Sequence, residues 1–181
     1  MRWCYWSHGL AGLNPSQKLL TKRIVSRPSL SYTAKISDFG FAKWGPAPGN
    51  SFVTGHVVGT MGYTAPEYLA AGKLYVNSDV YSFGVVLLEM LTGLKAIDTK
   101  RPYGQDNLVQ WWVKPYTSQK AKLRRMMDYR LEGKYSPKEA LEIALLADRC
   151  LNWEPKLRPS TKEVAETLEK IETRYRTDNE Q

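Results

Sequence analysis

Cysteine is scarce in this 181-residue sequence, which has only Cys4 and Cys150. The two lie 146 positions apart, and neither belongs to a Cys-x-x-Cys motif. These absences argue against a disulfide framework and a zinc site, and they favour a reducing compartment. Long hydrophobic runs are also missing, because the apolar stretch from Val80 to Leu88 is far shorter than the roughly 20 residues of a membrane span. The sequence therefore predicts no transmembrane helix.

Acidic residues are absent from positions 1 to 37, which carry six lysines and arginines. The whole chain has a formal charge of +8, so positions 38 to 181 are nearly neutral, with 20 basic and 18 acidic residues. In composition the acid-free stretch resembles a transit peptide, but Pro15 and Pro28 interrupt it and its amphipathic pattern is weak. A solvated basic segment is the simpler interpretation. A nucleic-acid or membrane-surface binder is a third-ranked hypothesis, because the charges are scattered and no recognition motif accompanies them.

The composition is otherwise that of a globular protein, with 43% hydrophobic and 24% charged residues, and the length suits one domain. Residues 1–32 show no sustained period of 2 or 3.6 and form an unassigned basic N-terminal segment. From position 33 the character changes: Ala34 to Ser37 alternates as a short strand does. A long loop rich in glycine and proline then runs to about Thr64, and loops of this length inside a domain are usually functional.

Beyond this loop the pattern predicts helices. Asn77 and Ser78 can cap a helix that is apolar nearly all round and ends at Gly93, which predicts a buried central helix. Ser136 and Ser160 each begin a Ser-x-x-Glu capping box, so each predicts a helix start. Two shorter helices are expected over 108–113 and 120–127. The positions expected to face inward after the two boxes are Leu141, Ala144, Leu145, Leu151, Val164, Leu168 and Ile171.

Four motifs occur in a fixed order along the chain. They are Asp38-Phe39-Gly40, Gly59-Thr60-Met61-Gly62-Tyr63 leading to Ala65-Pro66-Glu67, Asp79-Val80-Tyr81-Ser82-Phe83-Gly84, and Arg158-Pro159. Each tripeptide alone is a weak signal, but the set resembles the activation segment and central helix of a protein kinase. The sequences of these motifs and of Arg130-Leu131-Glu132-Gly133 are most similar to those of plant receptor-like cytoplasmic serine/threonine kinases. The resemblance covers about residues 34 to 171.

The resemblance implies a mainly α fold, that of a kinase C-lobe with a long activation-segment loop. It divides the chain into a partial kinase-like domain over 33–173 and a polar tail over 174–181. It also implies roles for single residues. Asp38 would hold magnesium and thereby ATP, and Thr60, Gly62 and Tyr63 would contact or shape the substrate site. The structural residues would be Phe39, Gly40, Asp79 and the Glu67–Arg158 ion pair, which would tie the end of the loop to the helical body.

Three hydroxyl groups of the loop are candidates for phosphorylation: Ser51, Thr54 and Thr60. A phosphate adds about −1.5 to −2 charge and can order a loop against basic residues. Related kinases commonly have two adjacent hydroxyls followed by a basic residue here, whereas this chain reads Val53-Thr54-Gly55-His56. We interpret His56 as a loop residue rather than as a catalytic base.

Motifs that a working kinase needs are absent from the 181 residues. There is no glycine-rich G-x-G-x-x-G loop, no strand lysine of the Val-Ala-Ile-Lys type and no His-Arg-Asp. The expectation is a kinase C-lobe without its N-lobe, which belongs to the serine/threonine kinase family but is inactive by itself. The alternative is a non-catalytic interaction module or decoy that binds kinase partners.

The partners expected from the resemblance are protein substrates or other kinases, with peripheral contact to a membrane and no nucleic acid. The expected location is cytoplasmic, at the plasma membrane where partners recruit the chain. Mg-ATP is the cofactor that the resemblance implies.

Overall fold

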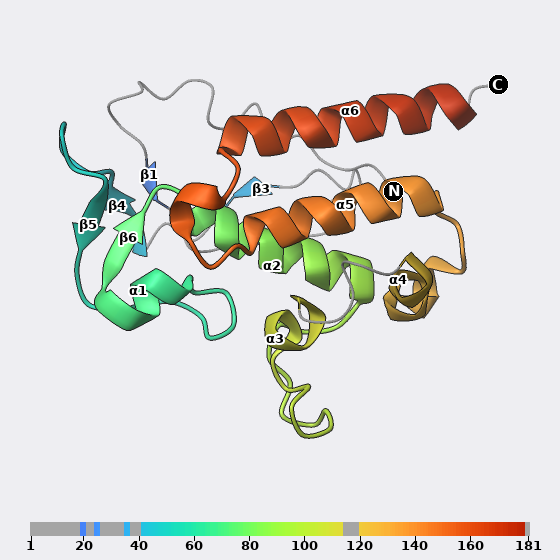
Figure 1. Ribbon diagram of the computed structural model, residues 1–181, viewed down its shortest axis with the longest axis horizontal. Coiled ribbons are helices and arrows are strands. Elements are labelled where there is room, and N and C mark those ends of the chain that lie inside the picture. Colours follow the sequence, from blue (N-terminus) through green and yellow to red (C-terminus); the bar gives the residue numbers. More distant parts are fainter. Residues whose placement is uncertain (1–18, 21–23, 26–34, 37–40, 114–119, 180–181) are drawn as a thin grey trace.

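The computed structural model describes residues 19–20, 24–25, 35–36, 41–113 and 120–179 of the chain. Helices dominate this part, so the predicted mainly α class is confirmed. The helices are α1 Pro66–Ala71, α2 Ser78–Thr92, α3 Leu108–Val113, α4 Lys120–Met126, α5 Pro137–Cys150 and α6 Thr161–Asn179, with 3-10 turns at Tyr129–Leu131 and Pro155–Leu157. Figure 1 shows α5 lying between α2 and α6, with α1 at one end of this stack.

The strands are short and pair antiparallel in twos. The pairs are β1 Leu19–Leu20 with β4 Lys43–Trp44, β2 Ile24–Val25 with β3 Lys35–Ile36, and β5 Phe52–Thr54 with β6 Lys73–Tyr75. The short strand expected at 34–37 is present as β3. In the third pair Val53 lies opposite Leu74, which joins the long loop to the chain just before α2.

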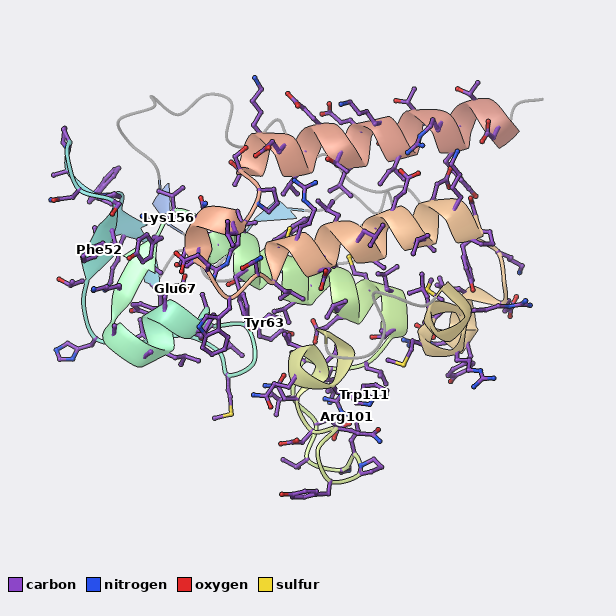
Figure 2. All side chains as sticks on the ribbon, viewed as in Figure 1. Phe52, Tyr63, Glu67, Arg101, Trp111 and Lys156 are labelled. Atoms are coloured by element: carbon purple, nitrogen blue, oxygen red, sulfur yellow. The ribbon has the colours of Figure 1, made fainter. Side chains whose placement is uncertain are left out.

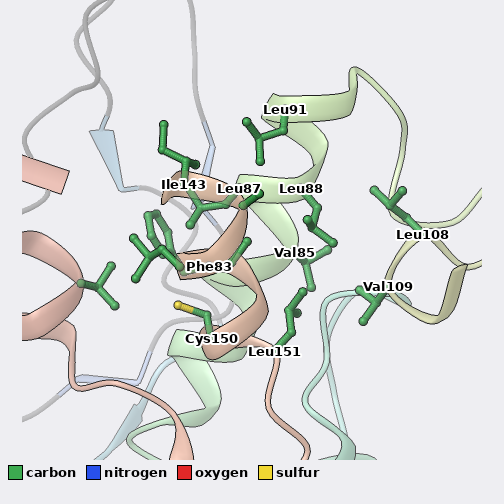
Figure 3. Packing of buried hydrophobic residues seen from close by; sticks show 14 of the residues in the cluster. Phe83, Val85, Leu87, Leu88, Leu91, Leu108, Val109, Ile143, Cys150 and Leu151 are labelled. Carbon is green, nitrogen blue, oxygen red and sulfur yellow. The ribbon is translucent and has the colours of Figure 1, made fainter. Parts of the chain in front are cut away.

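Helix α2 is the centre of the hydrophobic core, as its apolar sequence predicts. Its inward side chains pack against α5, and residues from α3, α4 and α6 complete the cluster (Figure 3). Gly84 allows α2 to lie close to α5: a Cβ atom at this position would lie 2.8 Å from the Cβ of Cys150. Burial raises the pKa of the Cys150 thiol to about 12, so the residue is a packing side chain.

The predicted helix ends are largely confirmed. Helix α2 ends at Gly93, which adopts the left-handed conformation, and the backbone N–H of Glu139 donates to Ser136 Oγ at the start of α5. The cap expected from Asn77 is wrong: its side chain makes no capping bond and instead donates to the carbonyl of Pro155. The start of α2 is therefore fixed by a contact with a segment 78 positions away.

The prediction that Leu145 belongs to the inward face of α5 is also wrong. Leu145 is 43% exposed, whereas Ile143, Leu146 and Ala147 are buried. The apolar stripe of α5 faces α2 with its 143, 147 and 150 positions, so position 145 points away from that contact. At the other end of the chain, α6 continues through Asn179, so most of the predicted polar tail is helical.

Helix α1 and the β5–β6 pair were not expected, and together they form a second small core. Tyr68 and Leu74 are almost fully buried there, with Val53 and Val76 packed against them. Pro66 suits the first turn of α1 because a proline there loses no helical hydrogen bond, and Gly72 ends the helix in the left-handed conformation. This small core holds the end of the long loop in place.

Candidate functional site

The candidate site is built around the stretch from Thr60 to Glu67, where the long loop ends and α1 begins. Asp38, Phe39 and Gly40 lie outside the described residues. The other residues named by the resemblance are described, and the structure brings most of them to one side of the first turns of α2. Figure 2 shows Tyr63 and Glu67 on this side of the molecule.

Glu67 and Arg158 form a two-bond ion pair. Arg158 Nη1 donates to Glu67 Oε1 at 2.8 Å, and Nη2 donates to Oε2 at 2.7 Å. The side chain of Arg158 is fully buried and that of Glu67 is 12% exposed. This parallel arrangement is the strongest geometry available to an arginine and a carboxylate.

The remaining donors of Arg158 are satisfied by backbone carbonyls. Its Nε donates to Asn152 at 2.8 Å, Nη1 to Asn77 at 3.1 Å and Nη2 to Trp153 at 3.2 Å. Its guanidinium also lies 5.1 Å from the centre of the Tyr81 ring, a cation–π contact. One side chain therefore joins α1, the start of α2 and the turn after α5.

A serine hydroxyl group completes the environment of Glu67. Ser78 Oγ donates to Glu67 Oε1 at 2.6 Å and accepts from the backbone N–H of Tyr75 at 3.0 Å. Burial acts to raise the pKa of Glu67, but the hydrogen bonds from Arg158 and Ser78 outweigh it, so the pKa lies below its ordinary value. Glu67 is thus held as a carboxylate.

Tyr63 is tied to α2 at two points. Its Oη donates to Glu89 Oε2 at 2.7 Å, and its carbonyl accepts from Ser82 Oγ at 2.8 Å. The other oxygen of Glu89 accepts from the backbone N–H of Ala96 at 2.7 Å, so one carboxylate connects the loop to the segment that follows α2. These bonds fix the conformation of the loop without using its outer surface.

Gly62 is required where it stands. Its φ is +90°, a conformation that side chains rarely adopt, and a Cβ atom there would lie 2.7 Å from Cγ1 of Ile97. The loop therefore packs directly against the segment after α2. Thr60 and Met61, on the outer side, are exposed and available to another molecule.

A cavity of about 10 Å³ separates the loop from the start of α2. Its lining includes Thr60, Tyr63, Ser78, Asp79 and Ser82, and its size suits about one water molecule. The structure thus brings Thr60 and Asp79 to one cavity.

The phosphorylation candidates Ser51, Thr54 and Thr60 are all exposed. Thr54 lies opposite Lys73 in the β5–β6 register. Lys43 lies near Gly55, because a Cβ atom at that glycine would meet its Nζ. Basic side chains are thus present beside the middle candidate.

Sequence reasoning missed several residues of the site. Ser78 was assigned only to a helix cap, and Glu89 was given no role, although both bind residues of the loop. No local pattern could have found them, since each contact joins positions at least 11 apart in the sequence. Among the described residues no group of three or more histidine, cysteine, aspartate or glutamate side chains is arranged to hold a metal ion. No helix of the described part is long and apolar enough to cross a membrane.

Comparisons with known proteins place this site in a family. Residues 21–168 match the model of the protein kinase domain. The chain is 46% identical over 179 residues to the probable serine/threonine-protein kinase PBL11 of Arabidopsis thaliana, covering 97% of this chain and 46% of that protein. It is 53% identical over 142 residues to the probable serine/threonine-protein kinase PBL10 of the same plant, covering 78% of this chain and 34% of that protein.

A rice relative extends the comparison. Receptor-like cytoplasmic kinase 176 of Oryza sativa subsp. japonica is 51% identical over 142 residues, covering 78% of this chain and 36% of that protein. The chain thus spans less than half the length of each of these relatives. The match to the domain model, which covers most of the sequence, shows that the chain belongs to the protein kinase family, with plant receptor-like cytoplasmic serine/threonine kinases among its relatives.

Proposed function

We propose that the chain supplies the activation segment and the substrate-side helical lobe of a serine/threonine protein kinase, which phosphorylates hydroxyl groups of proteins in the cytoplasm. The observation that carries this proposal is the Glu67–Arg158 pair. It fixes the end of the loop to the start of α2 with a buried arginine whose five N–H groups all donate. The names of the relatives support the serine/threonine class.

Within this function we assign the substrate platform to the loop that the pair holds. The exposed Thr60 lies on the outer side, while Tyr63 and Gly62 fix the backbone from below through Glu89 and Ile97. A substrate segment laid over Thr60 would meet a backbone already in one conformation, so little ordering entropy is lost on binding. Asp79 lines the cavity beneath this platform.

Mg-ATP is the cofactor of the family, and the proposed ligand Asp38 lies outside the described residues. Magnesium at ATP sites takes one or two carboxylates together with the phosphates. We therefore derive no step of phosphoryl transfer through this cofactor.

The 181 residues by themselves are proposed to be inactive. The sequence holds no His-Arg-Asp motif, so it offers no aspartate of that motif to accept the proton of a substrate hydroxyl. Phosphoryl transfer would need the catalytic residues that these 181 residues lack. The relatives are more than twice as long as the part of them that the chain matches, so they have room for such residues. The alternative of a non-catalytic decoy is not favoured, because the three relatives are all named as kinases.

A chimera tests this function. Residues 41–168 of this chain would replace the matching part of PBL10, with the parent protein assayed in parallel for transfer of labelled phosphate to serine and tyrosine peptides. We expect transfer to serine at a rate comparable to the parent's. The isolated 181-residue chain, mixed with Mg-ATP in a calorimeter beside an Asp38→Ala control, is expected to bind and transfer nothing. A folded chimera that transfers no phosphate beside an active parent would refute the function; transfer by the isolated chain would refute only its inactivity.

A further inference from the structure

A polar pocket is lined by residues of the segment before α5, the first turn of α5 and the last turns of α6. Figure 1 shows the beginning of α5 and the end of α6 at the opposite end of the molecule from α1. The volume of the pocket is about 470 Å³, and its lining residues are Lys134, Tyr135, Ser136, Glu139, Tyr175 and Asp178. The ion pair of Arg174 with Glu142 joins the two helices beside it. No residue of this pocket takes part in the Glu67–Arg158 pair or in the loop around Thr60, so the pocket is separate from the kinase platform.

Glu139 behaves differently from its counterpart in the second capping box. At the start of α6 the box is closed: Glu163 Oε2 accepts from the backbone N–H of Ser160 at 2.7 Å, and Ser160 Oγ accepts from that of Glu163. At the start of α5 only the second of these bonds forms, from the N–H of Glu139 to Ser136 Oγ. The carboxylate of Glu139 is not used by the box and lines the pocket instead.

Glu139 is a largely buried residue whose carboxylate oxygens remain accessible to solvent in the pocket. The residue is 9% exposed, and its carboxylate has neither a hydrogen bond nor an ion pair with any residue that the structure describes. Burial and the nearby charge of Asp178 raise its pKa, the opposite of the shift at Glu163. A carboxylate held in this way gains most from an opposite charge placed against it.

Three basic side chains of this region are already engaged in ion pairs. Lys134 pairs with Glu132, Arg174 with Glu142 and Arg176 with Glu172. Lys138 acts on Glu139 at a distance but makes no ion pair with it in the described structure. The pocket therefore presents a carboxylate of Glu139 that has no ion pair among the described residues, with Asp178 beside it; Arg174 and Lys138 act on the charge of Glu139 without a direct contact.

The lining fits one kind of ligand. The lining holds two carboxylates and one ammonium group, that of Lys134, which is largely exposed and paired with Glu132. The two carboxylates favour a cation, and the rings of Tyr135 and Tyr175 favour a flat, delocalised cation over a small hydrated one. A guanidinium group can donate two parallel hydrogen bonds to a carboxylate while its face lies on a ring. We propose that this pocket binds the guanidinium group of an arginine side chain presented by a partner protein. The proposal does not rest on the kinase function.

The test uses the full 181-residue chain and a small probe, N-acetyl-arginine methylamide, followed by the NMR signals of the tyrosine rings. The matched probe is N-acetyl-citrulline methylamide, which has nearly the same shape without the charge. We expect saturable binding of the arginine probe with shifts at Tyr135 and Tyr175, and binding at least tenfold weaker for the citrulline probe.

Two variants test whether the arginine probe binds at Glu139 and Asp178. Glu139→Gln, which keeps the shape of the side chain, is expected to weaken the arginine probe at least tenfold, and the exposed Asp178→Asn severalfold. Glu163→Gln, in the closed box, is the control and is expected to leave binding unchanged. Absence of saturation, equal binding of citrulline, or full binding by a folded Glu139→Gln variant would each overturn the proposal. Tighter binding of a lysine analogue would overturn the assignment to guanidinium.

Discussion

Arg158 donates all five of its N–H groups, two of them to the carboxylate of Glu67, a residue 91 positions earlier in the sequence. The other three go to the carbonyls of Asn77, Asn152 and Trp153. Because the guanidinium is fully buried, none of these bonds is replaced by water when the arginine is lost. The arginine thus holds three separate pieces of the chain together: α1, the start of α2 and the turn after α5.

Replacement of Arg158 by alanine should lower the free energy of unfolding by about 3–5 kcal/mol, the usual cost of breaking one partner of a buried ion pair. Glu67 would be left with only the Ser78 hydroxyl as a side-chain partner, and three carbonyls would each lose one donor, although that of Asn77 keeps the N–H of Tyr81. Arg158→Lys should recover only part of the loss, since an ammonium group has three donors and no planar fork. Urea denaturation of each variant measures the effect.

The matched control for this change is Arg174→Ala. Arg174 also donates two bonds to a glutamate, Glu142, but its side chain is 43% exposed. We expect a much smaller loss, because exposed ion pairs contribute little. Equal losses for the two variants would contradict the importance given to the burial of Arg158.

The stability of the protein should depend on the protonation of Glu67. Its pKa is lowered in the folded state from 4.5, so the unfolded state binds the proton more readily. The stability that this carboxylate contributes is present above pH 4.5 and is lost as the pH falls through the folded pKa. We expect the gap in unfolding free energy between the wild type and Glu67→Gln to narrow steadily below pH 4.5.

The pKa of Glu139 is shifted in the opposite direction from that of Glu67, so Glu139 serves as a control for the pH dependence. Its pKa is raised, so its contribution is greatest at low pH and is lost as the pH rises through the folded pKa. Glu139→Gln should therefore be at least as stable as the wild type at pH 7. A gap for Glu67→Gln that stays constant down to acid pH would show that Glu67 is not held as a carboxylate.

Substitution of Gly62 by alanine should destabilise the loop beyond the cost of its backbone conformation. The added Cβ would lie 2.7 Å from Ile97 Cγ1 and 3.1 Å from the Cβ of Ala96. Gly104 is the control: its φ is +78°, and a Cβ there meets nothing within 4 Å. We expect about 1–2 kcal/mol for Gly104→Ala from backbone strain alone, and more for Gly62→Ala.

Thermal unfolding followed by circular dichroism separates the two glycine variants. If Gly62→Ala lost no more stability than Gly104→Ala, then Ile97 would have to move aside freely, and the loop would not be packed as described.

The sequence predicts the fold well where the information is local. The Ser-x-x-Glu boxes at Ser136 and Ser160 mark helix starts because the cap and its partner are three positions apart. Gly93 marks the end of α2 because glycine readily adopts the left-handed conformation that ends a helix, which is also a local property. Asn77 shows the limit of such reasoning: its capping hydrogen bond was the local choice, but the carbonyl of Pro155 takes the side chain.

The parts that escaped prediction depend on distant contacts. The strands β5 and β6 have three residues each, too few for a periodic signal, and they exist because they pair with each other and cover Tyr68. The ion pair of Glu67 with Arg158 was expected only from the resemblance to a family, since nothing in the spacing of the two residues indicates it. The unshared carboxylate of Glu139 could not be expected at all, because its sequence context is the same kind of box as that of Glu163.

The separation of Glu67 from Arg158 also bears on the order of events during folding. Closing a loop of this size costs chain entropy before the contact repays it, and the contact needs the turn after α5 to be in place against the start of α2. We therefore expect the ion pair to form on the native side of the folding barrier. In kinetic terms it slows the opening of the lobe more than it speeds its assembly, so the platform around Thr60 is completed late and then persists.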